Sequence, residues 1–156
     1  MRRRRKQGGM TLVELIVAFT IMFVLASMAV PLARARIRMQ RERELRYDLR
    51  IMHAAIDKYK DYCDGGYFGP MKQGTDCYPE SLEQLVEGVK LAQSADGKKM
   101  RFLRSIPTDP FTGNKEWGLR SDQDDPTSTS WGGQNVFAVY TKTQEKAADG
   151  TSYSEW

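Results

Sequence analysis

Histidine and cysteine are almost absent from this sequence of 156 residues, which contains one histidine and two cysteines. It also lacks a Gly-x-Ser-x-Gly motif, a phosphate-binding glycine-rich loop and an evident pair of catalytic carboxylates. The residues that form the common types of active site are therefore missing. A zinc site needs more ligands than the two cysteines and the distant His53 supply. The composition therefore argues against an enzyme and against a zinc protein.

Charge is absent from Leu15 to Ala33, a run of 19 residues, and Glu14 is the only charged residue between Met10 and Ala33. An apolar run of about 20 residues is long enough to cross a bilayer as a helix. A carboxylate within such a helix is costly, at about 2.5–3.5 kcal/mol near the bilayer centre and less near its edge. Glu14 therefore needs a functional reason.

Positive charge is concentrated before this run, because residues 2–6 are four arginines and a lysine. The chain has 24 lysines and arginines and 20 acidic residues. Without these five basic residues (24 − 5), 19 basic and 20 acidic residues remain. Such a segment can indicate nucleic-acid binding or nuclear targeting. Directly before a membrane-length apolar run, it fits better as the positive-inside signal that holds the N-terminus in the cytoplasm. We therefore expect a membrane partner and no nucleic acid.

The junction between the basic and apolar segments resembles the class III signal peptide of type IV pilins and type II secretion pseudopilins. That pattern is a short basic leader, a glycine, a hydrophobic residue, Thr-Leu-x-Glu and an apolar helix that contains a proline. The matching residues here are Gly9, Met10, Thr11, Leu12, Glu14 and Pro31. The departure is Met10, because the family usually has phenylalanine there.

This resemblance implies that a prepilin peptidase removes residues 1–9 and that the new amine of Met10 is methylated. Residues 10–33 would then form a transmembrane helix that also serves in assembly, with Glu14 and Pro31 as assembly residues. In a filament, Glu14 would pair with the N-terminal amine of a neighbouring subunit. An unpaired buried carboxylate costs several kcal/mol, so this pairing would select the axial register.

Two other fates of the apolar segment are open. An ordinary secretory signal would be cut near Ala33-Arg34-Ala35, which loosely matches a small-residue cleavage site, and a soluble domain would be released. Against this, the apolar run is over-long and an arginine lies inside the cleavage motif. A single-pass anchor that is never cut would leave Glu14 unexplained.

The remaining sequence predicts an α+β fold of pilin-like type, in which a long N-terminal helix packs on a small antiparallel sheet. Residues 34–63 continue the helix as an amphipathic segment, because apolar residues recur at intervals of four and three, and Gly65-Gly66 ends it. Residues 64–156 then form a periplasmic globular domain. The apolar stripe consists of Leu45, Leu49, Met52, Ile56, Tyr59 and Cys63.

Local signals within the globular domain predict one helix and three strands. Ser81 and Gln84 have the spacing of a capping box and predict a helix over 81–92. The aromatic and β-branched content predicts strands over 100–103, 116–120 and 136–141. Residues 121–133 are polar and contain Pro126 and two glycines, so they predict a surface loop.

Three later segments resemble type II secretion major pseudopilins. Ile106–Asn114 is similar to that family's Pro-x-Asp-Pro-(aromatic)-x-Gly segment, and Ala148–Thr151 with Ser154–Trp156 looks like its C-terminal loop. The resemblance implies a structural subunit, anchored in the inner membrane by one helix, with a cytoplasmic N-terminus and a periplasmic domain. It would polymerise with itself into a periplasmic filament that drives protein export across the outer membrane.

The other partners implied are the prepilin peptidase, minor pseudopilins and the inner-membrane assembly platform. Three alternatives are open. The first is a type IV pilin, which serves adhesion, motility or DNA uptake. The second is a minor pseudopilin at the filament tip, and the third is a membrane-anchored periplasmic binding module that never polymerises.

Major pseudopilins hold a calcium ion in their C-terminal loop, so the resemblance implies calcium as a cofactor. Calcium takes roughly six to eight oxygen ligands. The corresponding loop, 141–153, contains Glu145 and Asp149 as its acidic residues. We expect Asp149 to be the main ligand, helped by Glu145 and backbone carbonyls, and a solvated acidic turn is the alternative. The acidic cluster at 122–125 lacks the spacing of a calcium loop.

Cys63 and Cys77 would both lie in the oxidising periplasm, so we expect a disulfide between them, with two free thiols as the alternative. Closing a loop of this length would stabilise the fold by about 3 kcal/mol in the chain-entropy model. His53 lies beside the apolar stripe, and we expect it to be a partly buried helix residue and not a metal ligand.

Overall fold

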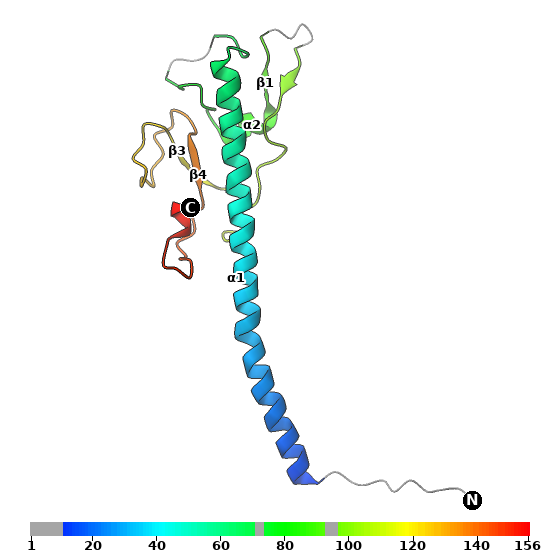
Figure 1. Cartoon of the computed structure of the whole chain (residues 1–156). Coiled ribbons are helices and arrows are strands. Elements are labelled where there is room, and N and C mark those ends of the chain that lie inside the picture. The colour runs from blue at the N-terminus through cyan, green and yellow to red at the C-terminus, as the bar shows by residue number, and fades with distance from the viewer. Residues whose placement is uncertain (1–10, 71–73, 93–96) are drawn as a thin grey trace, which may run out of the picture. The chain divides into compact units, whose positions relative to one another are not determined.

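A computed structural model describes residues 11–70, 74–92 and 97–156 of the chain (Figure 1). The chain divides into two compact units, Met1–Gln40 and Arg41–Trp156, and the first helix contributes residues to both. The elements are α1 (Leu12–Asp64), α2 (Leu82–Glu87), β1 (Val89–Lys90), β2 (Lys99–Met100), β3 (Gly118–Arg120), β4 (Ala138–Tyr140) and a short 3-10 helix, η1 (Tyr153–Glu155).

The described part of the first unit is the N-terminal portion of α1. The helix begins after Thr11, whose Oγ1 accepts a hydrogen bond from the Glu14 amide at 3.3 Å. Thr20 and Ser27 donate their hydroxyls to the carbonyls of Ile16 (2.8 Å) and Val24 (2.7 Å), so these polar groups are satisfied inside the helix. The helix continues through Pro31, as predicted, and does not end there.

The second unit is built on the C-terminal portion of α1. All six residues of the predicted apolar stripe are buried, with exposed fractions between 0 and 6%. Tyr59 lies near the end of this stripe and packs against Phe68 and Phe102, with ring centroids 5.0 and 5.4 Å apart. The amphipathic residues of α1 therefore belong to the same packed unit as the residues that follow them.

Gly65 and Gly66 end α1, as predicted. Gly66 has φ +73°, and the Tyr67 amide donates to the Tyr62 carbonyl at 3.1 Å. A left-handed glycine with this bond across the last turn satisfies helix carbonyls that have no partner within the helix.

The second helix, α2, starts at the predicted capping box. Ser81 Oγ accepts from the Gln84 amide at 3.4 Å, and Gln84 Oε1 accepts from the Glu80 amide at 2.8 Å. The prediction that this helix runs to 92 is wrong, because it ends at Glu87. Gly88 has φ +81°, and a Cβ there would lie 2.5 Å from the Met100 carbonyl oxygen. This close approach redirects the chain into β1.

The strands form two separate antiparallel ladders. Val89 of β1 pairs with Met100 of β2, and Leu119 of β3 pairs with Val139 of β4. The prediction of a long N-terminal helix with a small antiparallel sheet is confirmed, although the strand content is divided between the ladders. Figure 1 shows β3 and β4 on one side of α1, and α2 with β1 on the other. Residues 121–133 form turns between β3 and β4, as predicted.

Candidate functional site

The candidate assembly site is at the start of α1. Gly9 and Met10, the predicted processing residues, lie outside the described residues. The apolar part of α1 is long enough to cross a membrane, and none of that stretch is buried inside the structure. Leu12 and Phe23, for example, are each 77% exposed. An apolar surface of this extent requires a lipid or protein partner.

Glu14 lies in the first turn of α1, where the helix dipole favours a negative charge. Thr11 and Glu14 also have the spacing of a capping box, and the Thr11 half of that box is formed. Sequence reasoning missed this local role, although Thr-x-x-Glu before an apolar run is its signature. The cap and the charge are separable, because glutamine at position 14 retains a side-chain acceptor and has no charge.

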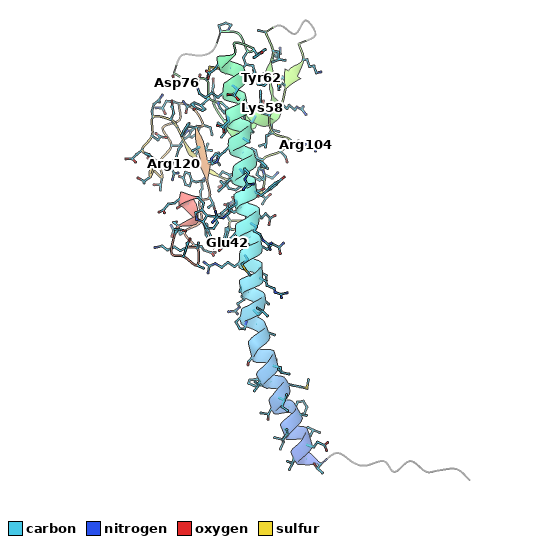
Figure 2. The ribbon with its side chains drawn as sticks, in the orientation of Figure 1. Glu42, Lys58, Tyr62, Asp76, Arg104 and Arg120 are labelled. Atoms are coloured by element: carbon cyan, nitrogen blue, oxygen red, sulfur yellow. A yellow bond between two sulfur atoms is a disulfide. The ribbon has the colours of Figure 1, made fainter. Side chains whose placement is uncertain are left out.

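A second group of contacts fixes the segment between α1 and α2. Cys63 and Cys77 form a disulfide, with their Cα atoms 5.5 Å apart. Lys60 Nζ donates to the Asp76 carbonyl oxygen at 3.0 Å, and Figure 2 shows Asp76 beside the end of α1. Asp76 and Cys77 have φ of +46° and +62°, a region that residues other than glycine seldom adopt. The disulfide and the lysine therefore hold an unfavourable backbone conformation in place.

His53 connects α1 to β4. It is half-buried, as predicted, and its Nε2 accepts a hydrogen bond from the Val139 amide at 3.2 Å. Accepting this bond requires a lone pair on Nε2, and hence an imidazole that is not protonated there. Burial lowers the pKa of His53 below its ordinary value, against the opposing charge of Asp57. His53 is thus a structural contact between the helix and the strand.

We expect the stability of the second unit to fall on mild acidification because of His53. Since its pKa is lower in the folded chain, the unfolded chain takes up the proton first, and the stabilisation is lost as pH falls below about 6.5. One proton allows a slope of at most about 1.4 kcal/mol per pH unit. Urea unfolding between pH 5 and pH 7.5 measures this slope.

His53→Gln is the matched variant, because the glutamine oxygen can accept from Val139 but does not titrate. Its unfolding free energy should depend less on pH than that of the wild type in the same window. Asp48 changes the pH dependence of stability in the opposite direction, because burial, and then the charges of Glu44 and Asp109, raise its pKa. Only the difference in pH dependence between the wild type and His53→Gln therefore reports on His53. Equal slopes of unfolding free energy against pH would contradict the stabilising role of the neutral His53.

The Ile106–Asn114 segment is organised by one buried carboxylate. Asp109 is 0% exposed, and its Oδ1 accepts from the Phe111 amide at 2.8 Å. Its Oδ2 accepts from the Thr141 hydroxyl at 2.5 Å. The indole of Trp117 donates to the Pro107 carbonyl at 3.0 Å. Asp109 thus joins the turn before β3 to the residue that follows β4.

The acidic residues at 122–125 cap the turns between β3 and β4. Asp124 Oδ2 accepts from the amides of Ser121 (2.7 Å) and Gly132 (3.1 Å), and these bonds lower its pKa. Asp122 Oδ1 accepts from the side-chain Nδ2 of Asn135 at 2.9 Å. Both carboxylates therefore already accept hydrogen bonds within the protein.

The calcium prediction for Glu145 and Asp149 does not fit the donor set of this loop. Asp149 Oδ1 accepts from both the hydroxyl (2.7 Å) and the amide (3.0 Å) of Thr151. Among the described residues, no three His, Cys, Asp or Glu side chains gather into a group that could hold a metal ion. Two carboxylates, one of them already bonded, fall short of the oxygen-rich shell that calcium takes.

Comparison with known proteins agrees with this geometry. Residues 4–30 match the family model described as the prokaryotic N-terminal methylation motif. The chain is 30% identical to type II secretion system core protein G of Pseudomonas aeruginosa, over 70% of this chain and 71% of the relative. It is 31% identical to the protein of the same name from Escherichia coli K12, over 71% of each chain. No solved structure matches it significantly.

The methylation motif, the long exposed apolar helix and the small α+β unit define a pilin-like protein with an N-terminal assembly helix. The identity and coverage of the two relatives make the assignment more specific. The chain belongs to the family of type II secretion system core protein G, the major pseudopilins.

Proposed function

We propose that this chain is the structural subunit of a type II secretion pseudopilus and polymerises through the N-terminal portion of α1. The observation that carries the proposal is the apolar stretch of α1, which is unburied in the isolated chain and holds one carboxylate, Glu14. Lipid can cover this surface before assembly, and equivalent helices can cover it in a filament.

Glu14 makes the assembly specific. In the filament it pairs with the positively charged amine of Met10 in the neighbouring subunit, once the leader has been removed. A buried carboxylate without a partner costs several kcal/mol, so a register that fails to bring the two charges together is rejected. Pro31 removes one helical hydrogen bond and loosens the helix locally, which helps the helices to pack.

The cellular setting follows from this role. The chain is anchored in the inner membrane by one helix, with the leader on the cytoplasmic side and residues 64–156 in the periplasm. A prepilin peptidase cuts after Gly9, and the amine of Met10 is methylated. The assembled filament is periplasmic, works with minor pseudopilins and the assembly platform, and drives protein export. The role is structural and not catalytic.

Mass spectrometry of the mature chain, taken from membranes of cells that contain a prepilin peptidase, tests this function. We expect the first residue to be Met10 and its amine to carry a methyl group. An intact Met1 would instead indicate a permanent anchor, and a start near residue 36 would indicate ordinary secretion. Either result would overturn the proposed function. Cells without the peptidase are the control and should retain the leader.

A further inference from the structure

The 141–156 segment is closed by hydrogen bonds within the protein, at the place where the family resemblance implies a calcium ion. Glu145 and Ala147 accept, through their carbonyls, from the amides of Tyr153 (3.4 Å) and Gly150 (3.0 Å). Four more carbonyls also accept hydrogen bonds. Three accept from backbone amides: Thr151 from Ala147, Ser152 from Glu155 and Tyr153 from Trp156. The carbonyl of Ser154 accepts from the Arg120 guanidinium. These six backbone oxygens, most of those between Glu145 and Ser154, therefore already have donors.

The carboxylate of Asp149 belongs to a chain of contacts that ends on α1. Trp156 Nε1 donates to Thr151 Oγ1 at 3.1 Å, and the Thr151 hydroxyl donates to Asp149 Oδ1 at 2.7 Å. The Arg46 guanidinium of α1 lies 3.7 Å from the centroid of the Trp156 ring, a cation–π contact. The Thr151 hydroxyl, the Thr151 amide and the charge of Arg46 all lower the pKa of Asp149. The carboxylate that would face calcium is thus connected to α1 through Thr151 and Trp156.

Tyr153 attaches the same segment to α1 a second time. Its ring is 0% exposed and packs on Phe111 and Trp156, at centroid distances of 4.3 and 4.8 Å. Its hydroxyl donates to Glu42 Oε1 at 2.6 Å, and Figure 2 shows Glu42 on α1 near this segment. Glu42 and Arg46 are four residues apart and therefore share one face of the helix. Both anchors of the segment lie on that face.

We propose that the 141–156 segment is held closed by its two contacts with α1, Arg46 on Trp156 and Glu42 on Tyr153, and needs no calcium ion. Arg46 is the positioning residue, because its guanidinium packs on the Trp156 ring, whose indole donates to Thr151. This property belongs to the single chain and does not depend on polymerisation.

The first test measures the melting temperature and the amide hydrogen exchange of the full chain in detergent micelles, with calcium chloride and with EDTA. Both quantities are expected to be the same in the two media. A site filled at 100 times its Kd would raise Tm by about 5–10 °C for a chain of this size. A saturable rise in Tm, or slower exchange in residues 141–156, with calcium but not with magnesium would overturn the proposal.

The second test separates Arg46 from general charge effects. Arg46→Met keeps most of the aliphatic stem but removes the cation, so exchange at the amides of Ala147, Thr151 and Tyr153 should become about three- to tenfold faster in both media. Lys58→Met, at an exposed position about three turns further along α1, is the control and should exchange as the wild type does. Unchanged exchange in R46M would overturn the role of Arg46. Loss of filaments in cells would bear on the proposed function alone.

Discussion

Filaments are expected to disappear when Glu14 is replaced by alanine, although the chain is still inserted and cleaved. In the proposed filament, the substitution would leave the amine of the neighbouring Met10 buried without its partner, at a cost of about 3–5 kcal/mol for each contact. That cost corresponds to a loss of more than about a hundredfold in the affinity between subunits. Sheared filaments, quantified by immunoblotting beside total and cleaved chain, give the measurement.

Two variants distinguish the charge of Glu14 from its place in the capping box. Glu14→Gln keeps an acceptor that can serve the cap, and we expect it to fail in assembly as Glu14→Ala does. Thr11→Ala removes the observed bond to the Glu14 amide and should cost the helix about 0.5–2 kcal/mol, but we expect it to assemble. Abundant filaments from E14Q would refute pairing of charges as the reason for this residue.

Removing the disulfide is expected to have the largest effect on the stability of the second unit. Replacing Cys63 and Cys77 by serine should lower the free energy of unfolding by about 2–5 kcal/mol. The disulfide connects α1 to Asp76 and Cys77, which both have a positive φ that residues other than glycine seldom adopt, so its loss also frees a strained turn. Urea unfolding of the two chains, followed by circular dichroism, measures the difference.

Reduction provides the control for this pair. Dithiothreitol should destabilise the wild type by about as much as the double substitution does, and it should leave the double variant unchanged. The chain has two cysteines and both are in the bond, so no other thiol contributes. Equal stability of the oxidised wild type and the serine variant would show that the lysine contact alone holds the 74–77 turn.

Much of the fold could be predicted because its signals are local. The four-and-three spacing from Leu45 to Cys63 fixes which face of α1 is buried, and Gly65-Gly66 fixes where the helix ends. The end of α2 could not be predicted, because it depends on the approach of the Met100 carbonyl to Gly88 across a ladder. The strand β1 likewise could not be predicted, because Val89 and Lys90 lie in the segment predicted as helix and pair with β2 across a ladder.

The candidate site likewise combines local sequence signals with contacts between residues that are distant in sequence. The assembly roles of Glu14 and Pro31 follow from the family resemblance and stay predictions, because only an assembled filament can test them. The closure of the 141–156 segment could not be predicted, because it depends on Arg46, about 100 residues earlier, and on a tyrosine bonded to Glu42. Acidic residues in a loop suggest a metal, and only the packed structure shows which of them are already bonded.

A cryo-electron microscopy map of the assembled filament, with side chains resolved at the start of the helix, tests the central claim most directly. The account predicts that each Glu14 carboxylate lies within about 4 Å of the first amine of an adjacent subunit, the range of an ion pair. A filament in which that carboxylate faces solvent, or lies beyond about 10 Å from every neighbouring amine, would contradict it.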